Sequence, residues 1–324
     1  MARILPRLFL DAAPIALLAG AGVMALRGPR RRPRAGFPGL GGGAKSPRRI
    51  PLAGWKAILL RTRTDFAQDQ ISMIAAGVAF YALLALFPAL GAFVALYGIF
   101  ADVGQVQHHL RILSLILPGD AWTFIGEQML RLAQANKGGL SFAFALGLLT
   151  SIWSANGAVQ AVITGLNVAY EERETRNFLH RRLLSLAFTL GYLAFAIVTV
   201  AVLGAGPAVG AVAGHRAAFL FNLISWPLLV VGLGAGLALL YHFGPSRRPP
   251  RWRWATWGGA AALTVWLAVS ALFSLYVGNF AHYDRTYGPL GAAVGFMMWS
   301  WLSSVIVLAG AELNSQIEKQ TAVR

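Results

Sequence analysis

The amino-acid sequence predicts an all-α protein, a polytopic transmembrane helix bundle with six core spans. Hydrophobic residues make up 57% of the 324 residues and charged residues only 12%, against roughly 25% charged residues in soluble globular domains. The apolar residues come in runs of about 18 or more, the length that crosses a bilayer as a helix. Basic residues gather in alternate connections between these runs, as in multi-pass membrane proteins.

The first region, residues 1–54, consists of an apolar segment and a basic linker. The apolar run at 8–26 fits a signal peptide, an interfacial helix or an extra N-terminal span. Cleavage as a signal peptide would send the following basic residues across the membrane, which the positive-inside tendency opposes. Residues 27–54 are rich in Pro, Gly and Arg and have no periodicity, so they predict a flexible linker.

Basic residues are concentrated just before the first clear span. Eleven of the 28 Lys and Arg lie between Arg27 and Arg63. The net charge of +16 would also fit nucleic-acid binding, but a basic cluster beside a membrane span is typical of a topology signal and an anionic-lipid contact. We therefore expect no nucleic acid as a partner and expect anionic lipid headgroups at Arg30, Arg31, Arg32, Arg34, Arg48 and Arg49.

The six-helix domain is expected over residues 55–318. It opens with a short amphipathic helix at 55–70 on the membrane surface, followed by the first span at 71–100. Pro88 lies inside that span, where proline removes a backbone donor and bends a helix. The bend is either structural or a hinge for gating.

The long connection 101–139 is too polar to span and predicts two short surface helices. It contains the adjacent His108 and His109, whose side chains would point about 100° apart on a helix, so they predict no shared metal site. The second span starts near Gly147. Four more spans are expected at about 184–206, 217–243, 255–280 and 288–313, before a short tail at 319–324.

A polar stripe runs along the second span. Asn156, Gln160, Thr164 and Asn167 fall within about 80° on one helical face, and the other faces are apolar. Because hydrocarbon offers no hydrogen-bond partner, the stripe must face other helices or a water-filled cavity. Interhelical hydrogen bonding and a cargo path both remain open. The residues that would line such a path are Tyr81, Asn156, Gln160, Asn167, Asn222 and Glu312.

Counting basic residues by loop predicts the orientation. Twenty-one of the Lys and Arg lie on the side that holds residues 27–70, and five lie on the other side. This bias places both ends of the core in the cytoplasm. Glu312 then lies near the cytoplasmic end of the last span, where it either reaches headgroup water or binds a proton that drives transport.

Residue usage disfavours an enzyme. The chain has no cysteine, which excludes disulfides and thiolate metal sites. The 12 Asp and Glu form no spaced cluster of the kind that holds catalytic metals, and the six histidines are scattered. No phosphate-binding G-x-x-x-x-G-K-[ST] stretch occurs. We therefore expect no catalytic residues, no metal and no cofactor.

Three stretches together resemble the YihY/BrkB family of bacterial inner-membrane proteins, which carry an older ribonuclease BN-like label. They are AAGVAFYALLALFP at 75–88, WSAN at 153–156 with LNVAY at 166–170, and YGPLG at 287–291 with LAGAELN at 308–314. The resemblance covers roughly residues 55–318, whereas the segment before residue 55 departs from the family pattern. It implies six helices, an inner-membrane location, and transport, including lipid transport, as the leading activity.

The sequence thus predicts an integral inner-membrane transporter or lipid translocase of undefined cargo. The alternative is a membrane scaffold or partner subunit that transports nothing, and a membrane-bound ribonuclease is a remote third. Cargo, direction, energy source and oligomeric state are left open.

Overall fold

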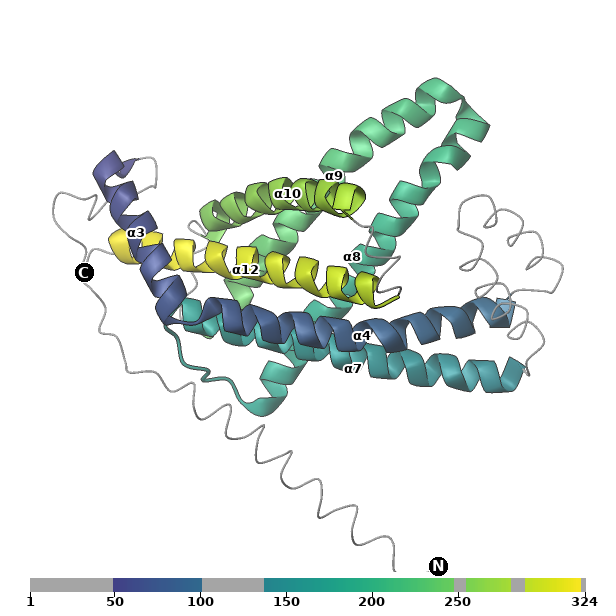
Figure 1. The fold of residues 1–324 in the computed structure, drawn as a ribbon, viewed down its shortest axis with the longest axis horizontal. Helices are drawn as coiled ribbons and strands as arrows, with labels where there is room; N and C mark the ends of the chain where they lie inside the picture. The colour runs from purple at the N-terminus through teal and green to yellow at the C-terminus, as the bar shows by residue number, and fades with distance from the viewer. Residues whose placement is uncertain (1–48, 101–136, 248–254, 281–288, 322–324) are drawn as a thin grey trace, which may run out of the picture. The chain divides into compact units, whose positions relative to one another are not determined.

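The computed structural model describes residues 49–100, 137–247, 255–280 and 289–321, and all of its regular structure in these ranges is helical. Figure 1 shows the helices, which are α3 (Leu52–Gln68), α4 (Ile71–Phe100), α7 (Lys137–Ala169), α8 (Phe178–Ala213), α9 (His215–Phe243), α10 (Ala255–Phe280) and α12 (Pro289–Thr321). Within the described ranges, six helices are long and apolar enough to cross a membrane. The predicted all-α bundle with six core spans is confirmed.

Several predictions fall outside the described residues. These are the N-terminal apolar segment, the basic arm as far as Arg48, and the surface helices with His108 and His109. Arg49 is described and is exposed.

The first span begins and ends where the sequence predicts, whereas other helices run beyond their apolar parts. α8 begins at Phe178, before the predicted start near 184, and α12 continues to Thr321, past the predicted end near 313. The last turns of α12 are polar but buried, with Gln316 and Gln320 almost inaccessible. A hydropathy pattern marks where the lipid-compatible part ends, and the helix continues because its polar side chains find partners in the protein.

Tight turns connect two of the helix pairs. Gln70 has a φ of 52° between α3 and α4, a left-handed conformation that is uncommon for a residue other than glycine. Gly214 has a φ of 83° and is the only residue between α8 and α9, so these helices form a hairpin with a one-residue turn. Both features keep sequential helices adjacent.

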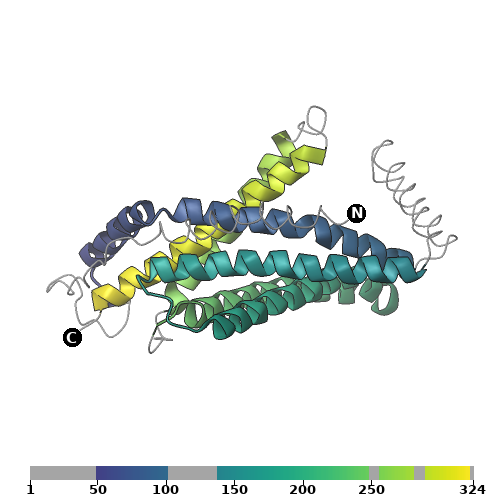
Figure 2. The ribbon, with the colours of Figure 1, turned by 90° about the horizontal axis from the view of Figure 1, so that it is seen from below.

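The helices pack in pairs, and α12 contacts helices of more than one pair. α4 and α7 run side by side, as Figures 1 and 2 both show, α8 pairs with α9, and α10 pairs with α12. α12 also contacts α3, α4 and α7. α4 continues through Pro88, which lies inside it.

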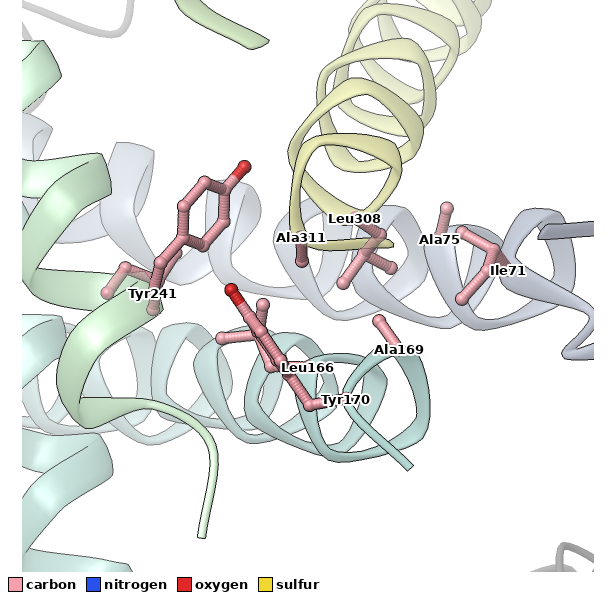
Figure 3. Close-up of a cluster of buried hydrophobic side chains, with 9 residues drawn as sticks. Ile71, Ala75, Leu166, Ala169, Tyr170, Tyr241, Leu308 and Ala311 are labelled. Carbon is pink, nitrogen blue, oxygen red and sulfur yellow. The ribbon is translucent and has the colours of Figure 1, made fainter. Parts of the chain in front are cut away.

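A buried cluster joins α4, α7, α9 and α12 (Figure 3). The alanines Ala75, Ala169 and Ala311 let three of these helices approach closely, because they carry only a methyl group. Larger side chains fill the remaining space, and these are Ile71, Leu166, Tyr170, Leu240, Tyr241 and Leu308. A second small cluster of Ile50, Ile58 and Ile317 packs α3 against α12.

Apolar side chains also remain on the outer surface of the spans. Ile197 and Val200 on α8 are 70% and 72% exposed, and Phe219 on α9 is 65% exposed. Such a surface is unfavourable in water and is compatible with lipid hydrocarbon.

Candidate functional site

The first half of the polar stripe links α7 to α8. Asn156 is buried and accepts a hydrogen bond from the Gln160 side-chain amide, one turn later on the same helix. The Ser185 hydroxyl on α8 donates to the same Asn156 oxygen at 3.2 Å. One side-chain oxygen of Asn156 therefore serves both α7 and α8.

The second half of the stripe links α7 to the ends of α8 and α9. Arg181 of α8 donates to the Thr164 hydroxyl at 3.2 Å. The side-chain oxygen of Asn167 accepts from the backbone N–H of Ser246 at 2.7 Å, and its amide nitrogen donates to Glu174 at 3.0 Å. The stripe residues are thus hydrogen-bonded to groups of α8, of the α7–α8 connection and of the segment after α9. These bonds fit a role in holding helices together, and the role as a cargo path stays a prediction.

The α7–α8 connection is held against the end of α9. Glu171 has a φ of 55° and turns the chain out of α7. Arg176 then donates to the backbone carbonyls of Phe243 and Gly244 at 3.0 and 2.9 Å. A cation at these carbonyls also interacts favourably with the C-terminal end of the α9 dipole.

A buried carboxyl–amide–carboxyl group lies where α3 meets α12. The Gln316 amide nitrogen donates to Asp65 at 2.8 Å and to Glu312 at 3.1 Å. Glu312 is 1% exposed, Gln316 2% and Asp65 7%. The second carboxyl oxygen of Glu312 is buried and has no hydrogen-bond partner among the described residues. Glu312 therefore does not reach headgroup water, although its position near the end of the last span would allow it.

A second polar group lies beside the first. The Arg247 guanidinium is 2.6 Å from the Glu318 carboxylate and lies over the Tyr170 ring, 4.2 Å from its centroid. Burial raises the pKa of Tyr170, an effect that Arg247 opposes and that the charges of Glu318 and Glu312 reinforce, so the phenol stays neutral. Tyr170 directly follows α7, and its phenol is close enough to Glu312 to be affected by the carboxylate charge.

The charged groups nearer the surface are partly exposed. Lys319 of α12 is 3.1 Å from Glu171, and both side chains retain some accessibility. Burial raises the pKa of Glu172, and the neighbouring Arg247 partly offsets this rise. Exposed pairs of this kind contribute little to stability, up to about 1 kcal/mol.

Two further buried residues tie helices to α12. The Tyr241 hydroxyl donates to the carbonyl of Val307 at 2.6 Å. The Asn314 side chain accepts from the backbone N–H of Gly258 at 2.7 Å. The sequence alone indicates no role for either residue, nor for Asp65 or Gln316. The available signal was the four-residue spacing of Glu312, Gln316 and Gln320, which puts three polar side chains on one face of a helix.

The two remaining predicted path residues, Tyr81 and Asn222, lie in different parts of the structure. Tyr81 of α4 is 42% exposed, and its ring lies over Gly157 of α7, where a Cβ atom would be 2.8 Å from the ring. Asn222 is exposed and lies beside Gly206 of α8, near the start of α9. Ser246, the partner of Asn167, follows the other end of α9, which is roughly 30 Å away along the helix.

An apolar groove of about 440 Å³ lies between α8 and α9. Residues that line it include Leu184, Phe188, Tyr192 and Phe195 of α8, and Gly232 and Gly236 of α9. Composition patterns did not indicate this groove, because it depends on which faces of the two helices meet. Among the described residues, no group of three or more His, Asp or Glu could hold a metal ion.

Comparisons with known proteins place the chain in a family. A family model described as "Virulence factor BrkB" matches residues 62–324, which is most of the chain. The ribonuclease-like protein YfkH of Bacillus subtilis is 28% identical over 251 residues, which cover 76% of this chain and 89% of that protein. A UPF0761 membrane protein of Verminephrobacter eiseniae is 30% identical over 271 residues, which cover 81% of this chain and 62% of that protein.

The chain thus spans less than two thirds of the length of the Verminephrobacter relative. No solved structure matches the chain significantly. The family match confirms the resemblance in the three sequence stretches, and the six membrane-capable helices agree with the membrane-protein names of the relatives. The chain therefore belongs to the BrkB family of membrane proteins.

Proposed function

We propose that this protein is a transporter or lipid translocase of the bacterial inner membrane, in which Glu312 takes part in the transport cycle. The observation that carries the proposal is the burial of Glu312 inside a membrane-capable helix with one carboxyl oxygen unbonded among the described residues. Ionisable groups inside a membrane are costly, and they usually mark ion pathways, substrate sites or proton relays.

The surroundings of Glu312 favour a conformational change at the contact between α3 and α12. Gln316 holds Glu312 and Asp65 with a single amide group, and Asp65 belongs to α3 rather than to a core span. Asp69, the residue that follows α3, and Lys319 of α12 also lie close enough to act on the Glu312 charge. A change in the charge of Glu312 would therefore alter how α3 is held against α12.

The orientation and the lipid contacts belong to the same proposal. The excess of basic residues on one side supports cytoplasmic positions for both ends of the core and for the polar region around Glu312. The basic arm that ends at Arg49 would then meet anionic headgroups on the cytoplasmic leaflet.

Two alternatives predict different behaviour. A scaffold or partner subunit would use the buried polar groups only to hold helices together and would translocate nothing. We do not propose an enzyme, because the buried carboxyls of Asp65 and Glu312 are bridged by the side-chain amide of Gln316. The ribonuclease-like name belongs to the Bacillus relative and is not evidence of nuclease activity in this chain.

The test is lipid translocation in proteoliposomes. Mass spectrometry of molecules that co-purify in mild detergent would identify cargo, and fluorescent phosphatidylglycerol and phosphatidylethanolamine are the first translocation probes. We expect the wild-type protein to accelerate movement between leaflets and Glu312→Gln to slow it several-fold. Glutamine preserves the acceptor for Gln316, so the thermal unfolding midpoint should stay close to that of the wild type.

The matched control is Glu172→Gln, which removes a carboxylate from the exposed α7–α8 connection. It should translocate at the wild-type rate. Wild-type protein that moves no probe and no co-purified molecule would favour the scaffold, and an undiminished rate in Glu312→Gln would remove Glu312 from the transport cycle.

A further inference from the structure

We propose that the groove between α8 and α9 binds an acyl chain of an anionic membrane phospholipid, and that His180 and Arg181 at its mouth bind the phosphate. This site would give the proposed function a class of cargo, and that part of the proposal rests on the proposed function. Binding is measured separately from transport.

The groove has the size and lining of a site for one lipid chain. Its volume of about 440 Å³ falls within the roughly 300–1,000 Å³ of typical ligand pockets. The α8 lining runs from Leu184 to Phe195, roughly 16 Å along a helix axis. This is about half of the ~30 Å hydrocarbon core, or one leaflet, which one acyl chain spans.

Small residues create the hollow. A Cβ atom added at Gly191 of α8 would have no heavy atom within 4 Å, and one added at Gly236 of α9 would have only Tyr192 at 3.8 Å. The surrounding side chains are almost entirely apolar, and both helices are membrane-capable over this length. Hydrocarbon rather than water therefore fills the groove in a bilayer.

A second hollow adjoins the groove at Leu184, toward the start of α8. This hollow of about 400 Å³ is lined by Asn177, Leu179, His180, Leu183 and Leu184, and Leu184 also lines the groove. His180 lines this hollow, and Arg181 follows it in the same turn of α8 without lining either hollow. A lipid with its chain in the groove would place its headgroup at these residues.

The mouth has positive charge without a protein counter-ion. Arg181 donates to the Thr164 hydroxyl, but among the described residues it pairs with no carboxylate, and its buried Nε has no hydrogen-bond partner. Arg182 lies over the rings of Trp153 and Phe178 at 5.4 and 5.3 Å, likewise without a described carboxylate partner.

Other arginines of the same region are paired. Arg247 contacts Glu318 at 2.6 Å, and Arg176 lies 3.9 Å from Glu174. A phosphate at the start of α8 would supply Arg181 with its missing anion through charge-assisted hydrogen bonds. The positive end of the α8 dipole would add to this attraction.

The test is native mass spectrometry of the full-length protein with added phosphatidylglycerol or phosphatidylcholine. We expect the wild type to bind phosphatidylglycerol more tightly than phosphatidylcholine. Gly191→Leu fills the groove without a backbone clash and should lower the affinity for both lipids by about tenfold. Arg181→Gln keeps an amide donor for Thr164 and should remove only the preference for phosphatidylglycerol.

The matched control is Gly77→Leu on α4, where an added Cβ atom also meets nothing within 4 Å. It should bind both lipids as the wild type does. Unchanged lipid binding by Gly191→Leu overturns the inference, and so does a wild-type dimer that Gly191→Leu converts to monomer, because a second copy would then occupy the groove. If the lipids bind as expected but the protein translocates no lipid, lipid translocation is refuted and the binding site remains supported.

Discussion

At the residue scale, the amides of the polar stripe differ in what they hold together. Gln160 bonds to Asn156 within α7, so its loss cuts no bond between helices. Asn167 bonds to the backbone of Ser246 and to Glu174, and its loss would release the segment that follows α9. The two amides look alike in the sequence, and the structure separates their expected effects on stability.

We expect Gln160→Leu to change the free energy of unfolding in detergent by less than about 1 kcal/mol, and Asn167→Leu to lower it by about 1–3 kcal/mol because the buried Ser246 N–H loses its acceptor. Thermal unfolding of the two variants measures this difference. If the stripe lines a cargo path, Gln160→Leu should nevertheless slow translocation. A stable Gln160→Leu protein with full translocation would contradict the path.

At the element scale, the tightest described approach joins α10 to α12. A Cβ atom at Gly258 would lie 2.2 Å from the carbonyl oxygen of Gly310, and one at Gly310 would lie 2.6 Å from the Tyr241 hydroxyl. Only glycine at both positions lets the two backbones approach this closely. The Asn314 hydrogen bond to Gly258 then closes the same junction.

Gly258→Ala should lower the free energy of unfolding by about 1–3 kcal/mol, since the obstructing atom is backbone and the helices must separate. Gly295→Ala on α12 is the control, because its Cβ atom would meet nothing within 4 Å. That change should be neutral or stabilise the helix by up to about 1 kcal/mol. Chemical unfolding in mixed micelles compares the two, and equal stability would refute the assigned contact.

At the scale of the whole molecule, the six membrane-capable helices define a multi-pass protein, and its orientation is open to a direct measurement. The chain contains no cysteine, so single cysteines report their own side of the membrane. The α7–α8 connection is exposed at Glu172. The basic-residue bias predicts that this connection is cytoplasmic and that residues 101–139 are external.

A cysteine introduced at Gln134 should react with a membrane-impermeant maleimide in intact cells, and one at Glu172 should react only after the cells are opened. Labelling of both positions in opened cells controls for accessibility. The reverse pattern in intact cells would invert the orientation and with it the assignment of the Glu312 region to the cytoplasmic side.

Much of this protein follows from its sequence. Hydropathy over about 20 residues is a local property, so the six spans, the start and end of α4 and the family pattern could all be recognised without coordinates. Helical periodicity likewise places Asn156, Gln160 and Asn167 on one face. Local pattern determines which helices form and which of their faces are polar.

Periodicity does not say which helix a face will meet, and there the tertiary structure decides. Gln316 bonds to Asp65 across 251 positions of sequence, and Asn314 bonds to Gly258 across 56. The groove exists only because the glycine-containing faces of α8 and α9 are opposed. These contacts depend on the packing of distant segments, because a side chain's burial and partners are properties of the assembled bundle rather than of its own helix.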